Sequence, residues 1–311
     1  MNESLARLIT EHRIHEVECV IPDMTGIARG KILPKDLFLG AGEMRLPKSV
    51  LLNTVNGQQP DNGPHVGDTD PDMVCRPDAA TFRVVPWAAE PVAVVIHDCF
   101  EWDGTPVLLS PRAVLRRVIE LYTQRGWFPV VAPEMEFYLV ARQQNPHEPL
   151  QPPIGRSGKT EAGRQSYSID AVNDFDPLFM ELSSFCEAHR LGVETLIHEA
   201  GAGQMEINFS HGDPMDLADR VFLFKRTVRE TALRHGIFAP SWPSRWRWSP
   251  AARCTSTRAW SIRTTGRTSS RCPTAARARS SCTTSPVCKS TFRRCCRCWR
   301  RTSTRTAACR A

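Results

Sequence analysis

Residues 193–209 read VETLIHEAGAGQMEINF, and this stretch determines how the centre of the chain folds. Two runs with alternating apolar residues flank the tetrapeptide Ala-Gly-Ala-Gly, which is typical of a tight turn. The pattern predicts a β-hairpin with strands over 193–199 and 204–210. Because alternate residues of a strand point to opposite faces, the second strand presents one polar face made of Gln204, Glu206 and Asn208.

A second acidic pair lies in WFPVVAPEMEFYLV (127–140), which we predict to be one strand. Glu134 and Glu136 are two residues apart, so both leave the same face of that strand. Two like charges in an otherwise apolar strand are costly without a cation, unless the pair lies at an exposed edge.

The predicted hairpin adds Glu199 and Glu206, which flank its turn and can approach each other. Four carboxylates on two strand systems suit a hard divalent cation such as Mg²⁺ or Mn²⁺, because such ions prefer oxygen ligands. The alternative is an ordinary solvated sheet face without a bound ion. The neighbouring His198 is a single histidine and is expected to be structural.

Local signals around this centre predict an α+β protein. Apolar residues at helical spacing, with capping and stop residues, predict helices over 4–15, 110–126, 176–189 and 213–235. Short strands are expected over 17–23, 28–34 and 92–96, the first two forming a hairpin. Residues 145–165 are rich in Pro, Gly and polar side chains and are predicted to be a mobile loop.

The first 239 residues read as an ordinary cytoplasmic protein. The chain of 311 residues has no run of 18 apolar residues, and its N-terminus carries early charges instead of an apolar signal segment. We therefore expect a cytoplasmic location and no membrane contact. The four cysteines before residue 240 have no metal-ligand spacing and are predicted to be reduced core residues: Cys19, Cys75, Cys99 and Cys186.

A sharp change in composition divides the chain at residue 240. Residues 240–311 contain 17 of the 40 Lys and Arg and no Asp or Glu, so the net charge is −10 before this point and +17 after it. The same stretch holds 8 of the 12 Cys, 5 of the 8 Trp and no Leu. A globular domain without Leu is very unusual, so we expect 240–311 to be non-native and disordered.

Three motifs before this point carry a resemblance to a known family. Over residues 1–239 the chain resembles the glutamine synthetase family. The motifs that carry this resemblance are DMTGIARGKILP (23–34), PEMEFYLV (133–140) and IHEAGAGQMEINF (197–209). SYSIDAVNDFDP, which begins at Ser166, and the stretch that begins at His211 are closer to its γ-glutamylputrescine (polyamine) synthetase branch. The resemblance implies a β-grasp domain over 1–105, followed by the first part of the catalytic domain over 106–239.

The resemblance also implies an activity. Members use ATP to phosphorylate the γ-carboxyl of glutamate, and ammonia or an amine such as putrescine then displaces the phosphate. Two divalent ions, Mg²⁺ or Mn²⁺, stabilise the charge of the phosphoryl group. Members assemble as homo-oligomeric rings with active sites between subunits, and Asp72 matches a β-grasp aspartate that reaches a neighbouring subunit's site.

Five more residues match functional positions of that family. Glu136, Glu199 and Glu206 match the three carboxylates of one metal site. Glu134 matches one ligand of the second metal site. Tyr167 matches a tyrosine near the amine pocket.

The family pattern stops at the composition change. Relatives continue with an FMAKP segment, a His-x-His and the Arg and Lys of the nucleotide site, whereas His235 is the last histidine here. Plausible codons for 241–248, read in another phase, give TFMAKPMAM, and those for 249–261 give EPGSAMHVHQSVV. We therefore interpret 240–311 as a frameshift product that follows loss of one base near codon 240. We expect the truncated chain to be inactive, because the Arg and Lys set that binds ATP is missing.

A second hypothesis gives residues 240–311 a function of their own. A segment of charge +17 with interleaved Trp can bind phosphate backbones and stack on bases, so a nucleic-acid-binding protein is the alternative. Cys295, Cys296 and Cys298 lack the paired spacing and the partner histidine of a zinc site. We expect nucleic-acid contact through this stretch to be nonspecific.

Overall fold

We describe a computed structural model of the chain that covers residues 3–240, except 56, 59–65, 67, 68, 144 and 146, and the backbone of 259–264. The described residues all belong to one unit of the chain, residues 1–265. The predictions of a disordered frameshift tail and of nucleic-acid contact concern residues that lie, apart from 240 and 259–264, outside the described part. Among the described helices, none is long and apolar enough to cross a membrane.

The N-terminal part forms a six-stranded sheet around the central strand β6 (Val92–Phe100). The strand order is β2-β1-β6-β4-β3, and β5 also pairs with β6. β1 runs parallel to β6, and the other strand pairs of this sheet are antiparallel. The remaining strands are β1 (Glu16–Pro22), β2 (Ala28–Pro34), β3 (Met44–Pro47), β4 (Asp72–Pro77) and β5 (Arg83–Val84).

Helix α1 (Glu3–Glu11) covers this sheet because its apolar stripe, Leu5 and Ile9, is buried in the N-terminal core. The predicted amphipathic helix and the β1–β2 hairpin are therefore confirmed. The four cysteines are buried and free, as predicted. The short helices of this part are α2 (Lys35–Ala41), η1 (Lys48–Leu52) and η2 (Ala79–Thr81).

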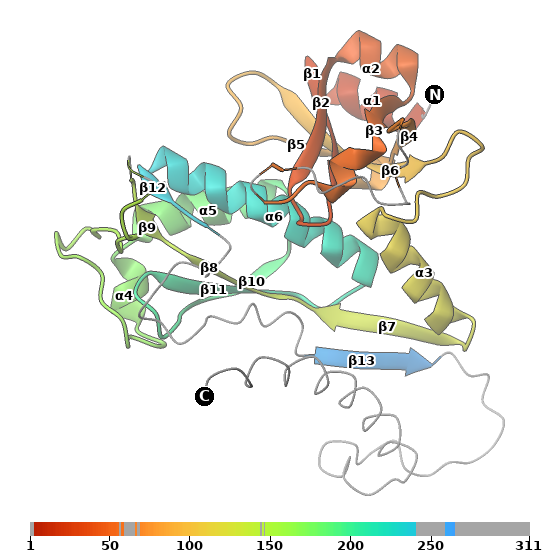
Figure 1. Ribbon diagram of the computed structural model, residues 1–311. Helices are drawn as coiled ribbons and strands as arrows, with labels where there is room; N and C mark the ends of the chain where they lie inside the picture. The colour runs from red at the N-terminus through yellow and green to blue at the C-terminus, as the bar shows by residue number, and fades with distance from the viewer. Residues whose placement is uncertain are drawn as a thin grey trace, which may run out of the picture. The chain divides into compact units, whose positions relative to one another are not determined.

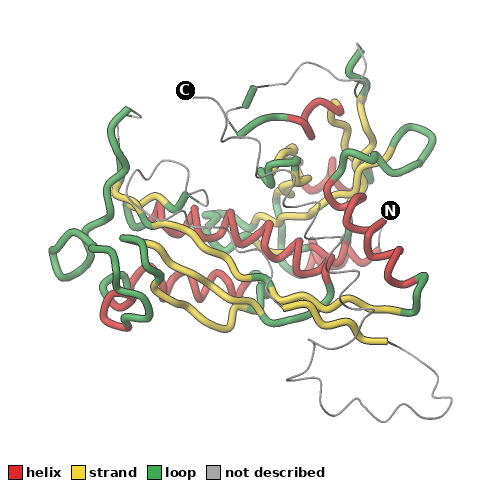
Figure 2. The backbone as a smooth tube through the Cα atoms, turned by 60° about the horizontal axis from the view of Figure 1, so that its bottom comes forward, coloured by secondary structure: helices red, strands yellow, loops and turns green. Residues whose placement is uncertain are grey.

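The second part contains a three-stranded antiparallel sheet in the order β10-β11-β8. Helices α5 and α6 lie on one side of this sheet (Figures 1 and 2). Phe137 and Met205 point from the sheet toward these helices and pack in one core with Leu182 and Phe224. The elements are β8 (Glu134–Tyr138), α4 (Ile169–Asn173), α5 (Asp176–Ala188), β10 (Val193–His198), β11 (Gln204–Phe209) and α6 (Pro214–Arg234).

The single strand predicted over 127–140 is wrong, because the structure divides it into β7 (Trp127–Ala132), β8 and β9 (Val140–Ala141). The first break falls at Pro133, which has no backbone N–H to donate to a ladder. The three pieces pair with different partners: β7 with β13 (Ala259–Thr264), β8 with β11, and β9 with β12 (Ile237–Phe238). The correction leaves Glu134 and Glu136 together on β8.

Capping residues define the ends of the two long helices beside this sheet. Asp213 caps α6, since its Oδ1 accepts from the backbone N–H groups of Met215 and Asp216 at 2.9 and 3.0 Å. α3 (Pro111–Thr123) begins after Ser110, which has the backbone geometry of an N-cap, but the Ser110 side chain hydrogen-bonds to Cys99 instead. The predicted starts of both helices are confirmed.

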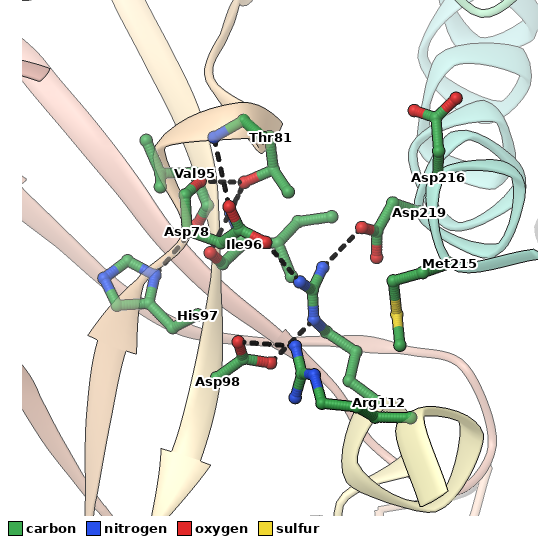
Figure 3. A network of polar contacts seen from close by, with 12 residues as sticks. Asp78, Thr81, Val95, Ile96, His97, Asp98, Arg112, Met215, Asp216 and Asp219 are labelled. Atoms are coloured by element: carbon green, nitrogen blue, oxygen red, sulfur yellow. Dashed lines mark hydrogen bonds and ion pairs between the residues drawn. The ribbon is translucent and has the colours of Figure 1, made fainter. Parts of the chain in front are cut away.

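Arg112 of α3 ties the N-terminal sheet to helix α6 (Figure 3). Its side chain is 3% exposed and pairs with Asp78 and Asp219 at 2.5 Å and with Asp98 at 2.9 Å. Burial raises the pKa of Asp219 to about 6, although the charge of Arg112 works against this shift. One guanidinium therefore compensates three carboxylates from three elements and fixes α6 against the first sheet.

Candidate functional site

The candidate site lies on the face of the second sheet that points away from α5 and α6. The β10–β11 hairpin turns at Gly203, whose φ is +67° and where a Cβ would lie 2.4 Å from the carbonyl oxygen of Leu139. Only glycine fits such a backbone. The turn brings β11 antiparallel to both β10 and β8, so acidic residues far apart in the sequence share one face.

The register brings the predicted glutamates together. Glu206 lies directly opposite Glu136 on β8, and Asn208 lies opposite Glu134. Glu199 follows β10, and its N–H donates to the carbonyl of Gln204 at 2.8 Å, which continues the ladder by one residue. The sequence-based expectation that the four carboxylates meet on adjoining strands agrees with this register.

Electrostatics confirm that these carboxylates are neighbours. Burial raises the pKa of Glu206, and the charges of Glu199, Glu134 and Glu136 raise it further. A pKa shift of this kind means that each additional negative charge on this face costs free energy. A bound cation would lower this cost, because it attracts all four groups.

Gln204 holds Glu136 in place. The side chain of Gln204 is buried, its Nε2 donates to Glu136 Oε2 at 2.9 Å, and its Oε1 accepts from the N–H of Gly201 at 2.8 Å. The amide thus connects the β10–β11 turn to the acidic pair on β8. On the same face, Asn208 Oδ1 is buried and has no hydrogen-bond partner in the described part of the chain.

The oxygen atoms on this face suit a divalent ion. The donors are carboxylate and amide oxygens, which is the ligand type that Mg²⁺ and Mn²⁺ prefer, and the unpartnered Asn208 oxygen adds one more such donor. Within the described residues, however, no three His, Cys, Asp or Glu side chains converge closely enough to ligate one ion. These residues have the right ligand atoms for Mg²⁺ or Mn²⁺ and lie on one face of the sheet. Binding an ion requires side-chain rotations that bring their oxygens together.

Tyr167 lies beside this face, at the end of the excursion over 145–165. Its backbone N–H donates to the carbonyl of His198 at 2.9 Å, which places it next to Glu199 in the hairpin. Its side chain is 73% exposed, and its φ of +63° is in the left-handed region that non-glycine residues rarely adopt. Strain of this kind occurs where surrounding contacts determine the backbone, often at functional sites.

His198 and Glu161 form a buried pair at the same place, and this partnership was not predicted from the sequence. His198 Nε2 lies 2.9 Å from Glu161 Oε1, and His198 Nδ1 lies 2.6 Å from the carbonyl oxygen of Glu199. Burial alone lowers the pKa of His198, but its hydrogen bonds to Glu161 and to the Glu199 carbonyl outweigh burial and raise it. The structural role expected for His198 agrees with these contacts. Glu161 was missed because it lies in a segment without periodicity.

Asp72 lies away from this group. It is the first residue of β4, in the N-terminal sheet, and its side chain is exposed. The four glutamates and Tyr167 belong to the second part of the chain. The expectation that Asp72 serves a neighbouring subunit's site remains a prediction.

Comparisons with known proteins agree with this arrangement. Residues 108–247 match the family model described as glutamine synthetase, catalytic domain. A γ-glutamylputrescine synthetase of Escherichia coli K12 is 32% identical over 235 residues, which cover 72% of this chain and 48% of that protein. A glutamate–isopropylamine ligase of a Pseudomonas species is 29% identical over 244 residues, covering 74% and 51% of the two chains.

Solved structures show the same fold. A structure named "GmaS/ADP complex-Conformation 1" has a TM-score of 0.62 and 22% identity, and the match covers 78% of this chain and 52% of the other. A "novel glutamine synthase homolog" has a TM-score of 0.60 and 23% identity, covering 73% and 50%. The chain thus spans about half the length of the relatives it matches. On its sequence matches, the chain belongs to the glutamine synthetase family.

Proposed function

We propose that the function encoded by residues 1–239 is that of an ATP-dependent ligase that joins the γ-carboxyl of glutamate to ammonia or an amine such as putrescine. The observation that carries this proposal is the register of Glu206 opposite Glu136, with Glu199 and Glu134 beside them, in a chain of this family. The two similar relatives named for amine substrates favour an amine over ammonia as the acceptor.

The four glutamates have separate roles in this proposal. Glu136, Glu199 and Glu206 would hold one Mg²⁺ or Mn²⁺ ion, and Glu134 would supply one ligand of a second. When bound, such ions neutralise the charge of the nucleotide phosphates and of the transferring phosphoryl group. Gln204 keeps Glu136 oriented toward the shared face through its 2.9 Å hydrogen bond. Tyr167, which matches a tyrosine near the amine pocket of the family, would line the amine side of the site.

Titration of the full 311-residue chain with Mn²⁺ tests the metal part of this proposal. We expect saturable binding, followed by the electron paramagnetic resonance of free Mn²⁺, and loss of it in Glu136→Gln, Glu199→Gln and Glu206→Gln. Replacing a residue that only orients a metal ligand typically weakens metal binding by roughly 10- to 100-fold. Replacing a ligand itself should weaken Mn²⁺ binding at least as much.

The matched control for this titration is Glu194→Gln, because Glu194 is an exposed glutamate of β10 that hydrogen-bonds to Ser210 at 2.8 Å. This variant should bind Mn²⁺ like the unmodified chain. Equal binding by all four variants and the unmodified chain would contradict the proposed site.

We further propose that residues 240–311 are an out-of-frame reading and that the 311-residue chain is an inactive, truncated form of the ligase. Residues 240–311 contain no Asp or Glu, and the family match ends seven residues after residue 240, at 247. Sequencing the gene across codons 235–245 tests this proposal. One additional base near codon 240 is expected, and an unaltered reading frame in genomic DNA would show that the organism carries the frame as given.

A further inference from the structure

Glu161 is a buried carboxylate inside a polar, Pro- and Gly-rich segment. Its side chain is 2% exposed and accepts hydrogen bonds from His198 Nε2 at 2.9 Å, from Gln165 Nε2 at 2.8 Å and from the backbone N–H of Gly203. Carboxylates are almost never buried to this degree unless they are paired, so these donors must all be in place when the segment is folded.

Backbone contacts attach the same segment to the hairpin. The N–H of Arg164 donates to the carbonyl of Ala200 at 2.7 Å, and that of Tyr167 donates to the carbonyl of His198 at 2.9 Å. Arg164 and Tyr167 both have left-handed backbones, with φ of +67° and +63°. Two such residues three positions apart cost conformational free energy, which the contacts of Glu161 offset.

His198 extends the connection from Glu161 to the acidic face. One imidazole nitrogen contacts Glu161, and the other lies 2.6 Å from the carbonyl oxygen of Glu199. The backbone carbonyl of His198 itself accepts from Tyr167. His198 is fully buried, so these contacts of its ring are direct and are not bridged by solvent. The backbones of Tyr167 and Glu199 are therefore both attached to His198, and the ring of His198 is attached to Glu161.

We propose that Glu161 and His198 are positioning residues that hold Tyr167 beside Glu199 and so shape the amine side of the site. This inference rests on the proposed function, in which Glu199 is a metal ligand and Tyr167 lies near the amine. The ring of Tyr167 is exposed and can contact a substrate. Its backbone N–H is bound to the carbonyl of His198, whose buried ring pairs with Glu161.

Fluorine NMR of the full chain labelled with fluorotyrosine tests the proposal, because the sequence contains three tyrosines. Tyr167→Phe assigns the resonance of Tyr167, and the other two belong to Tyr122 on α3 and to the buried Tyr138 on β8. In Glu161→Gln we expect the Tyr167 resonance to move toward the position of free fluorotyrosine while that of Tyr122 stays; Tyr138, whose ring lies against the turn at Gly201, reports on the turn itself. The reason is that an amide cannot accept from both Gly203 and His198 without aiming its own donor at one of them.

The control is Glu148→Gln, which changes an exposed glutamate of the same excursion. It should leave all three resonances unchanged. An unchanged Tyr167 resonance in Glu161→Gln, or an equal shift in Glu148→Gln, would overturn the proposal. If Glu161→Gln moves all three resonances because the chain unfolds, Gln165→Ala replaces it. That variant removes one donor to Glu161, and absence of a Tyr167 shift in it would equally overturn the proposal.

Adding Mn²⁺ separates this inference from the proposed function. We expect Mn²⁺ to broaden the Tyr167 resonance of the unmodified chain, and to broaden it less in Glu161→Gln at equal metal occupancy. If Mn²⁺ broadens no resonance while Glu161→Gln still moves Tyr167, the metal site fails and the positioning role stands. If Mn²⁺ broadens Tyr167 equally in both chains, the positioning role fails and the metal site stands.

Discussion

Glu206 of β11 lies directly opposite Glu136 of β8, on the face of the sheet opposite to the one from which Phe137 and Met205 pack in the core with α5 and α6. Like charges directly opposite each other in an antiparallel sheet are destabilising, by about 0.2–1 kcal/mol. The raised pKa of Glu206, caused by burial and then by the three neighbouring glutamates, shows the same repulsion. The fold therefore tolerates an unfavourable acidic face, which is expected where a site is kept for binding rather than for stability.

The first prediction follows from this repulsion. In the presence of a chelator, Glu206→Gln should raise the free energy of unfolding in urea by up to about 1 kcal/mol, because it removes one of two opposed charges. In saturating Mn²⁺ the unmodified chain should have the higher free energy of unfolding of the two, since only this chain gains stability from binding the ion. Glu194→Gln serves as the control and should change neither value. A Glu206→Gln chain that is less stable in chelator would contradict the repulsion.

The second prediction concerns Arg112, the buried guanidinium between Asp78, Asp98 and Asp219. Arg112→Ala leaves these carboxylates with only Arg116, which contacts Asp98 at 2.9 Å. Breaking a buried ion pair on one side typically costs about 3–5 kcal/mol. We expect a loss of this size in urea unfolding, whereas Arg117→Ala, an exposed position on the same helix, should cost little. A small loss in Arg112→Ala would show that water reaches the aspartates.

Local signals predicted much of this fold correctly, and the reasons are physical. The β10–β11 hairpin and α6 were predictable because their turn glycines, cap and periodicity lie within the segment itself. The break at Pro133 was missed although proline carries a strong signal, because the apolar run on both sides of it reads as one strand. Which partner each piece pairs with is decided by tertiary contacts that the local pattern does not contain.

The candidate site was predictable only in part for the same reason. The faces of Glu134, Glu136, Glu199 and Glu206 follow from strand alternation, so their meeting could be anticipated. Glu161 could not be found this way, because its burial depends on a histidine 37 positions away and on a turn amide of Gly203. The one available signal for Glu161 was its position shortly before the motif that contains Tyr167, in a segment otherwise expected to be solvated.

The third prediction is that the chain loses stability between pH 6.5 and pH 4. Burial lowers the pKa of His97 and of His189 from 6.5 to about 4 in the folded chain. In this window the unfolded chain binds protons that the folded chain rejects, so the free energy of unfolding falls as the pH falls, by about 1 kcal/mol per histidine and pH unit. Asp219, whose pKa is raised to about 6, and Glu206, whose pKa is also raised, act in the opposite direction and make the slope smaller than the two histidines alone would give.

Urea unfolding as a function of pH measures this slope, and His189→Gln should lower it by the contribution of one histidine, about 1 kcal/mol per pH unit. The Nε2 of His189 is buried without a hydrogen-bond partner in the part of the chain that the structure describes, while its Nδ1 lies 3.1 Å from Thr227 Oγ1. After burial, the charges of Arg226 and Arg83 oppose a protonated ring at this position. Asp219→Asn should steepen the slope instead, because it removes one opposing group. A flat profile in the unmodified chain would show that these histidines are not buried in solution.

The fourth prediction compares the 311-residue chain with a version in which one base is restored near codon 240. β12 is the last described strand before residue 240, and it pairs with β9. The restored reading continues from there with the His-x-His that the given chain lacks after His235. We expect ATP-dependent γ-glutamylamine formation from glutamate and putrescine by the restored chain alone, followed by mass spectrometry of the product. Product formation by the 311-residue chain would show that residues 1–239 and the given tail suffice for catalysis, and would contradict the frameshift interpretation.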